Sequence, residues 1–267
     1  MSEPKPPILS HKHYAAASAF TPENLLREAR RQKRLLPGTI PEICVLDPDG
    51  DIVRYLRATG RAEQSRDWAC YHTDLFVFGH QGHEYGIIGC AVGASYAVLI
   101  AEELFASGCQ FLVSVTSAGQ IRPVQAPPYF VIIERALRDE GTSYHYLAPS
   151  DYSIADPQLV ADARDALSAA QISAHVGDSW TTDAPFRETA EAIEIAARAG
   201  ILAVEMEAAA LYAFAKTRNH PVLCFAHVTN QMALIDGDFE KGTADGAEIS
   251  LKVIALAAAS WRARRQP

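Results

Sequence analysis

The chain has 267 residues, of which 49% are hydrophobic and 21% charged, and its formal net charge is −8 at pH 7. This composition is that of a folded globular protein, long enough for one large α/β domain or two small ones. The acidic balance and the lack of a basic stripe argue against a nucleic-acid-binding surface. No apolar run reaches the roughly 18 residues of a membrane-spanning helix. We therefore expect neither nucleic acid nor a membrane among the partners.

The five cysteines are odd in number, widely scattered and mostly inside apolar stretches. This usage predicts buried thiols rather than disulfides, and hence a reducing, cytoplasmic location. The first residues, Met-Ser-Glu-Pro-Lys-Pro-Pro, lack the apolar core of a secretory signal. No C-x-x-C pair suggests zinc.

Residues 1–42 are expected to form an N-terminal arm and a helix. The arm is Pro-rich and then Ala-rich, and the helix begins after Thr21, where a proline follows the N-cap. Strands are predicted at 43–46, 75–78 and 85–92, and the last two are joined by a hairpin-like link. A helix from 93 to 107 then leads to a strand at 109–115. Strand, helix and strand at this spacing form a βαβ unit, which implies a parallel pair.

In the second half, strands are predicted at 129–134, 172–177, 201–204 and 222–228. Helices are predicted at 157–170, 188–199, from 206 onward, and at 245–264. The alternation of strands and helices predicts an α/β fold: one three-layer α/β/α domain over 43–267, with a mostly parallel central sheet covered on both faces.

Two carboxylates, Glu205 and Glu207, stand where an almost wholly apolar helix begins. A buried carboxylate is unfavourable unless it is hydrogen-bonded or paired, although a helix N-terminus stabilises an anion. These acids are therefore either helix caps or functional groups.

Ligands of such folds bind beyond the carboxyl ends of the strands. Four predicted loops follow strands and carry small or polar residues. They are 90–95, 116–119, 181–187 and 229–231.

The run Val-Glu-Met-Glu-Ala-Ala-Ala-Leu-Tyr, at 204–212, resembles the signature of the purine nucleoside phosphorylase and uridine phosphorylase superfamily. Four further places agree with that family in the same order, and the uridine phosphorylase-like branch fits best. They are Cys90-Ala-Val-Gly-Ala, Thr116-Ser-Ala-Gly119, Arg138-Asp-Glu-Gly-Thr-Ser-Tyr-His and Thr182-Asp183. The resemblance covers most of the chain from about residue 43. It implies a nucleoside phosphorylase that cleaves an N-glycosidic bond with phosphate to give free base and sugar 1-phosphate.

The resemblance also implies roles for individual residues. Glu207 would grip the sugar hydroxyls, with Glu205, Met206 and Thr116 beside the sugar. Asn230 and Asp183 would assist the departing base, which gathers negative charge. Arg187 is a further candidate there, and Phe186 either stacks on the base or simply packs.

Phosphate, the co-substrate, would be held by Gly93 and Ser117 and by Arg66 from a neighbouring subunit. That role of Arg66 implies a dimer-based homo-oligomer, of which a hexamer is one form. No cofactor and no metal are implied.

The chain departs from the family pattern at the phosphate end. The family has Gly-Asp-Pro-x-Arg after its first strand, whereas this chain has Leu46-Asp-Pro-Asp-Gly-Asp-Ile-Val-Arg54, and Ser114 stands where an arginine is expected. Either Arg54 turns inward and completes the site, or the acids repel phosphate and water is the nucleophile. At the base end, Asn230 replaces an acid, which favours a pyrimidine or 6-oxopurine nucleoside.

Several alternatives stay open. A nucleosidase of the same fold, or a nucleoside-binding protein without catalysis, fits the altered phosphate site. Gly93-Ala-Ser95-Tyr-Ala97 is one residue short of a serine-hydrolase nucleophile elbow, with His220 or His227 as its base. A metal pair at His80 and His83 lacks a third ligand nearby in the sequence.

Overall fold

The computed structural model describes residues 6–232 and 236–265. The first five residues of the predicted arm and the last two of the predicted domain lie outside this description. The strands are β1 (Ile43–Asp47), β2 (Ala62–Gln64), β3 (Phe76–His80), β4 (His83–Gly89), β5 (Phe111–Gln120), β6 (Tyr129–Asp139), β7 (Tyr152–Ile154), β8 (Ala174–Thr182), β9 (Ala203–Glu205) and β10 (Val222–Asn230).

The α-helices are α1 (Pro22–Lys33), α2 (Asp51–Ala58), α3 (Ala94–Ala106), α4 (Ser143–Tyr146), α5 (Pro157–Ala169), α6 (Ala190–Arg198), α7 (Ala208–Arg218) and α8 (Ala247–Ala263). Three short 3-10 helices, η1 (Pro7–Leu9), η2 (Pro185–Arg187) and η3 (Thr243–Gly246), complete the described elements. Among the described residues, no helix combines the length and apolar character needed to cross a membrane.

The strands form one sheet in the order β10-β6-β8-β9-β5-β1-β4-β3-β2, and β7 pairs with β6. Strand β10 also pairs with β5, so that β5, β9, β8, β6 and β10 close into a ring. Strands β1, β4, β3 and β2 extend from this ring as an open sheet. The closure was not predicted from the sequence, because it depends on β10 having two partners.

The sheet is mixed, which corrects the prediction of a mostly parallel one. Among the described strands, the parallel pairs are β1–β4, β1–β5, β5–β10, β6–β8 and β8–β9. The antiparallel pairs are as many: β2–β3, β3–β4, β5–β9, β6–β7 and β6–β10. The segment between β5 and β6 contains no helix and is too short for a crossover, so β6 returns in the direction opposite to β5.

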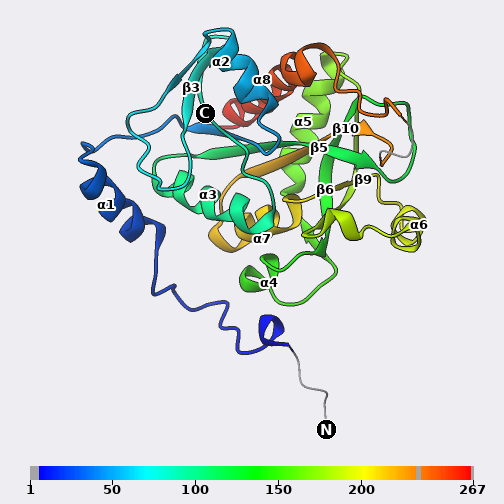
Figure 1. The fold of residues 1–267 in the computed structure, drawn as a ribbon, viewed down its shortest axis with the longest axis horizontal. Coiled ribbons are helices and arrows are strands. Elements are labelled where there is room, and N and C mark those ends of the chain that lie inside the picture. The colour runs from blue at the N-terminus through cyan, green and yellow to red at the C-terminus, as the bar shows by residue number, and fades with distance from the viewer. Residues whose placement is uncertain (1–5, 233–235, 266–267) are drawn as a thin grey trace.

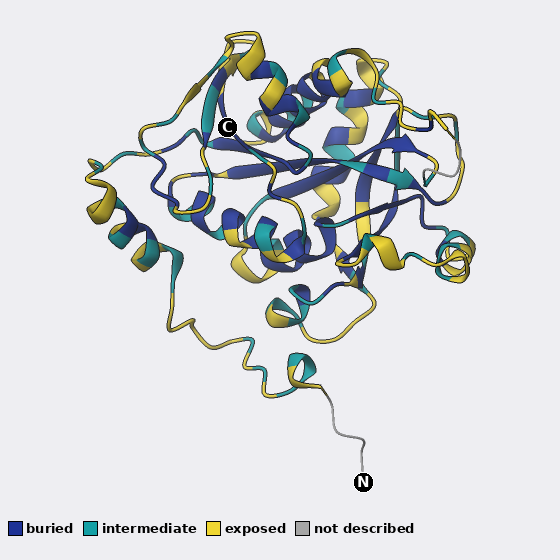
Figure 2. Ribbon diagram, in the orientation of Figure 1, coloured by how far each residue is buried: buried dark blue, intermediate teal, exposed yellow. Residues whose placement is uncertain are grey.

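Helices cover both faces of the sheet, as predicted for a three-layer α/β fold. Helices α3, α4 and α7 lie on one side and α2, α5 and α8 on the other (Figure 1). The central strands are buried and the outer helix faces are exposed (Figure 2). Every residue of β1 and of β10 is buried, which is why both strands begin with apolar runs, at 43–46 and 222–226.

Helix α3 connects β4 to β5 as the βαβ pattern predicts. The two strands run parallel, but β1 lies between them and pairs with both. The predicted hairpin of β3 and β4 is confirmed. Near the start of the chain, α1 is capped by the Thr21 hydroxyl, which accepts a hydrogen bond from the Asn24 amide. The segment before α1 extends to α4 (Figure 1), where the Tyr14 hydroxyl donates a hydrogen bond to the carbonyl of Tyr144. A boundary at residue 42 stays a prediction.

Candidate active site

Glu205, the last residue of β9, uses both carboxylate oxygens inside the protein. Its Oε1 accepts hydrogen bonds from the hydroxyls of Ser179 and Thr181 on β8. Its Oε2 accepts from the backbone amides of Glu207 and Ala208, each at 2.7 Å. These amides open α7 and have no partner within the helix. Glu205 therefore caps α7 from the preceding strand, and its oxygens already have protein donors where a sugar contact was expected.

Glu207 is the N-cap residue of α7 and is 1% exposed. Its Oε1 accepts a 2.7 Å hydrogen bond from the Gly93 amide at the start of α3. Its Oε2 is buried and has no hydrogen-bond partner. Burial first, and then the neighbouring Glu205, raises the pKa of Glu207 to about 8. A buried oxygen without a partner is unfavourable unless a ligand supplies a donor, so Glu207 has an acceptor available for substrate.

Gly93 reaches this position in a backbone conformation that side chains rarely adopt, with φ of 90°. Its amide is the one that the sequence assigned to phosphate, and here it binds Glu207. Met206 lies between the two acids in the chain and is half-buried, and its contact with a sugar stays a prediction.

Thr116 and Ser117 lie within β5, which continues to Gln120, so the loop predicted at 116–119 is wrong. The extension is stabilised because β9 and β10 pair with β5 there. The nearby hydroxyl of Thr116 counters the rise in the pKa of Glu207. Ser117 donates from both its amide and its hydroxyl to the two carboxylate oxygens of Asp49, each at 2.6 Å.

The contact between Asp49 and Ser117 follows from the strand register. In the parallel pair β1–β5, Leu46 is opposite Ser114, and Asp49 and Ser117 each lie three residues further along. A carboxylate of the chain thus binds the amide and the hydroxyl of Ser117, one of the residues that the resemblance assigns to phosphate.

The neighbouring acids of the turn after β1 have different partners. Asp47 is 2% exposed and accepts hydrogen bonds from the amides of Gly50 and Val53 at the start of α2. Burial raises the pKa of Asp47 to about 7. Asp51 forms ion pairs with Arg54 and with Lys241. Arg54 is largely exposed and turned toward Asp51, so it does not complete a phosphate site in this structure.

Lys241 was not found by sequence reasoning. Its ammonium contacts Asp51 and lies 4.0 Å from Asp49. No local pattern marks it, because it lies in an irregular segment and its partners are 190 or more positions away in the sequence.

His227 on β10 lines the same small cavity as Asp49, Ser117 and Lys241. It is 5% exposed, stacks on Phe130 with ring centroids 4.5 Å apart, and its Nε2 has no partner. Burial, and then the nearby Lys241, lowers the pKa of His227 to about 4. The imidazole is therefore neutral at neutral pH.

Asn230 ends β10 beside the other strand ends. Its amide nitrogen lies 3.4 Å from the carbonyl oxygen of Ala118, and its Oδ1 accepts a hydrogen bond from the Met232 amide. An added Cβ at Gly119 would lie 2.5 Å from Met232 Sδ and 3.4 Å from Asn230 Oδ1. The glycine thus lets the Met232 side chain pack beside the amide.

The remaining base candidates lie on an exposed segment after β8. Asp183 accepts a hydrogen bond from the Gly141 amide. The Phe186 side chain is 99% exposed and Arg187 is exposed as well. The structure does not bring Phe186 or Arg187 against Asn230.

Two arginines from the resemblance lie elsewhere. Arg66 is exposed and lines a surface hollow with Trp68 and Asp74, away from Glu207. Arg138 is 4% exposed and donates to Ser143, to Ser150 and to two backbone carbonyls. Its guanidinium holds the segment after β6 in place.

The competing sites do not assemble in the described part of the chain. Ser95 is exposed on α3, whereas the His220 ring stacks on Phe105 and the His227 ring on Phe130. His80 and His83 face each other across the β3–β4 hairpin. No group of three or more His, Cys, Asp or Glu side chains suited to a metal ion occurs among the described residues.

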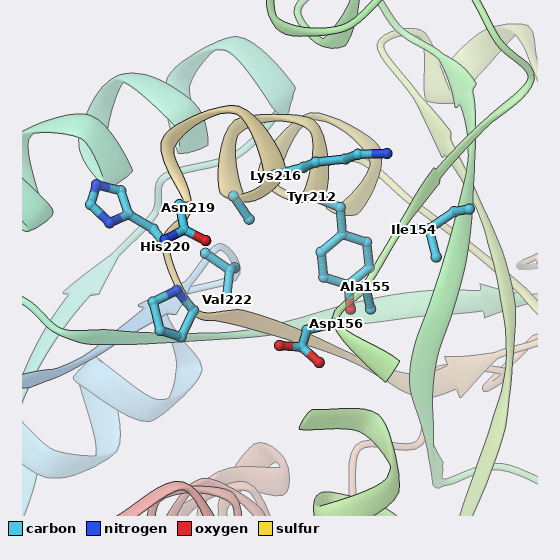
Figure 3. Close-up of a pocket in the computed structure, with 10 residues that line it drawn as sticks. Ile154, Ala155, Asp156, Tyr212, Lys216, Asn219, His220 and Val222 are labelled. Atoms are coloured by element: carbon cyan, nitrogen blue, oxygen red, sulfur yellow. The ribbon is translucent and has the colours of Figure 1, made fainter. Parts of the chain in front are cut away.

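A hollow of about 510 Å³ lies at the opposite end of β10. Figure 3 shows Tyr212 and Lys216 from α7 and Asp156 from the start of α5 around it. Tyr212 donates a 2.6 Å hydrogen bond to the carbonyl of Ile133. Because this hollow meets the amino end of the strand, it is not where ligands of such sheets bind.

The fold is that of an α/β protein whose candidate site lies at the strand ends, around Glu207 and Thr116. The chain belongs to the phosphorylase superfamily, whose family model matches residues 42–260. The resemblance found in the sequence is thereby confirmed.

The chain is 30% identical to a DeoD-type purine nucleoside phosphorylase of Roseobacter denitrificans over 183 residues, which are 66% of this chain and 78% of that protein. It is 23% identical to a guanosine phosphorylase of Halorubrum lacusprofundi over 212 residues, 79% of either chain. These homologues are nucleoside phosphorylases, which are pentosyltransferases.

Solved structures share the fold. A uridine phosphorylase of Vibrio fischeri superposes with a TM-score of 0.67 at 19% identity and covers 83% of this chain and 90% of its own. A purine nucleoside phosphorylase of Toxoplasma gondii, in complex with immucillin-H, has a TM-score of 0.70 at 16% identity. The match covers 86% of this chain and 93% of the Toxoplasma gondii protein. The predicted α/β class is confirmed.

Proposed function

We propose that this chain cleaves the N-glycosidic bond of a pyrimidine or 6-oxopurine nucleoside with phosphate, releasing free base and sugar 1-phosphate. The observation that carries the proposal is Glu207, whose Oε1 is anchored by the Gly93 amide while its buried Oε2 has no partner. A sugar hydroxyl that donates to Oε2 supplies the missing hydrogen bond. Such a bond strengthens as positive charge develops on the sugar in the transition state.

Other groups are placed for the same reaction. Thr116 lies beside Glu207, and Met206 would pack on the sugar. Glu205 acts on the site by fixing the backbone of Glu207 rather than by contact with the substrate. Phosphate would take the amide and hydroxyl of Ser117, with the Gly93 loop alongside.

Asn230 supports the choice of base. Its amide can donate to the oxo group of a departing pyrimidine or 6-oxopurine, but it cannot protonate a leaving adenine. Asp183, Phe186 and Arg187 stay candidates from the resemblance alone, because their side chains lie in an exposed segment.

We further infer that active sites form at contacts between subunits of a dimer-based homo-oligomer. Arg66 is exposed and remote from Glu207 of its own chain, so it can serve the site only of a neighbouring subunit. Sedimentation equilibrium tests this inference. A monomer that cleaves nucleosides at full rate would exclude it.

The free thiols support a reducing, cytoplasmic location.

Hydrolysis is the second candidate, and one observation favours it. The Asp49 carboxylate binds both donors of Ser117, where phosphate is expected. If Asp49 stays there, water is the nucleophile and the chain is a nucleosidase.

Product analysis separates these functions. Uridine, inosine and adenosine are incubated with the protein, with and without phosphate, and the sugar product is identified by chromatography. Phosphate-dependent formation of sugar 1-phosphate is expected. Free sugar formed at the same rate without phosphate identifies a nucleosidase. Binding of nucleoside without cleavage of any substrate identifies a binding protein.

A further inference from the structure

We propose that Asp49 and Lys241 form a charge switch that controls phosphate binding at Ser117. Asp49 competes with phosphate for the Ser117 donors, and Lys241 is the cation that binds phosphate once Asp49 has turned away. This inference rests on the proposed phosphorolysis and goes beyond it. It names Lys241 as the cation in place of the arginines that the family has at the phosphate site, and Asp49 as the group that competes with phosphate.

The first step of the argument is the shape of the Asp49 contact. Two oxygens of one carboxylate accept from the amide and the hydroxyl of Ser117, each at 2.6 Å. Two oxygens of a phosphate can accept from the same pair of donors in the same way. Asp49 is therefore a direct competitor for this position rather than a distant repulsive charge.

The second step is that Asp49 is free to leave. It lies in the turn between β1 and α2, and its side chain is 29% exposed. The next residue, Gly50, has a φ of 75° that belongs to the turn itself. Rotation of the Asp49 side chain toward solvent changes only side-chain torsions, and no helix or strand bond depends on its carboxylate.

The third step is the balance of charge. Lys241 contacts Asp51 and lies 4.0 Å from Asp49, and its side chain is 24% exposed. Asp51 is also paired with Arg54. When Asp49 turns outward, Lys241 keeps Asp51, which it shares with Arg54, and faces Asp245 across the cavity, so the region beside Ser117 loses one negative charge. Asp47, whose pKa is raised to about 7 by burial, carries only part of a charge there at neutral pH.

A fourth observation comes from β10, where His227 is paired with Ser117 in the parallel register of β10 and β5. The imidazole of His227 is 5% exposed, lines the cavity with Ser117 and Lys241, and has no partner at Nε2. With a proton on Nε2 it can donate to an oxygen of phosphate. An anion beside Lys241 would thus satisfy a buried polar atom that the fold leaves unpaired. Asp245 is the further acid on this cavity, and its charge faces Lys241.

The test is calorimetric titration of the full chain with inorganic phosphate, without nucleoside, for three variants. Asp49→Asn should bind phosphate about tenfold more tightly than the native chain, because the competing charge is lost. Lys241→Met should bind about tenfold more weakly, and Lys241→Arg should bind nearly as well as the native chain. Asp165→Asn and Lys252→Met are matched controls at exposed positions outside the site and should leave phosphate binding unchanged.

Thermal melting of each variant establishes that it is folded before titration. The half-saturating phosphate concentration for nucleoside cleavage is then measured and should shift in the same directions.

Unchanged or weaker phosphate binding by folded Asp49→Asn overturns the switch, as does unchanged binding by folded Lys241→Met. If cleavage by the native chain still depends on phosphate in that case, the proposed function survives without the switch. If the native chain instead releases free sugar without phosphate and Asp49→Asn abolishes this activity, Asp49 serves a water nucleophile. Both proposals then fail.

Discussion

Glu205 accepts a 2.7 Å hydrogen bond from the backbone amide of Glu207, two residues along the chain. One acid thereby fixes the position of the other. All four hydrogen bonds to Glu205 come from the protein, whereas one oxygen of Glu207 is buried without a donor. Two neighbouring carboxylates of the same motif thus differ in their surroundings: Glu205 organises the start of α7, and Glu207 is the one for which we propose the sugar contact.

Glu207→Gln should keep the fold and lose most nucleoside cleavage. The amide keeps an oxygen for the Gly93 amide but cannot ionise, so it cannot become the carboxylate that stabilises the sugar in the transition state. We expect a loss of about 2–4 kcal/mol in transition-state stabilisation, measured as kcat/KM. Glu191→Gln, at an exposed helix start, is the matched control. Near-native turnover by the folded variant would show that Glu207 is only a helix cap.

Glu205→Ala should act mainly on stability. The substitution leaves two hydroxyls and two buried amides without their acceptor, so the free energy of unfolding should fall by about 2–4 kcal/mol. Urea denaturation measures this change, with Glu191→Ala as the control for a first-turn acid. A variant as stable as the native chain would contradict the assigned capping role.

Stability should depend on pH through Glu207. Because burial raises its pKa to about 8, the folded chain holds a proton that the unfolded chain releases above its ordinary value near 4.5. The contribution of the Glu207 proton to the free energy of unfolding is complete below pH 4.5. As the pH rises from 4.5 toward 8, this contribution is lost by up to about 1.4 kcal/mol per pH unit. Urea denaturation of the native chain and of Glu207→Gln at pH 5 and pH 8 isolates this contribution.

The difference in unfolding free energy, native minus variant, should decrease with increasing pH. Asp47 changes stability in the same direction, but it is present in both proteins and its contribution cancels in the difference. A difference that stays constant between pH 5 and pH 8 would show that Glu207 titrates near its ordinary pKa in the folded chain.

Asn230→Asp should change the choice of base. The native chain should prefer uridine or inosine to adenosine, because an amide donates to an oxo group. An aspartic acid can protonate a leaving purine, so the ratio of kcat/KM for inosine over adenosine should fall about tenfold or more. Steady-state kinetics on the three nucleosides check this. A native preference for adenosine would refute the role of Asn230.

The sequence by itself determined the elements that depend on near neighbours. The Thr21 cap of α1, the β3–β4 hairpin and the apolar runs of β1 and β10 involve residues within a few positions of one another. The order of motifs from Cys90 to Tyr212 was enough to identify the superfamily. The sequence also pointed to Glu205 and Glu207 as carboxylates where an apolar helix begins, and the resemblance assigned the sugar hydroxyls to Glu207.

Only the tertiary structure decided which partners these residues have. The closure of the ring through β10 depends on two pairings of one strand. The Asp49–Ser117 contact spans 68 positions and follows from the register of β1 with β5. The contact of Lys241 with Asp51 spans 190. A hydrogen bond or ion pair acts over a few ångströms, whereas local sequence patterns report only residues within about a helical turn or a strand. Only the folded chain could therefore show that Glu205 caps α7 and that Lys241 lies beside Asp49.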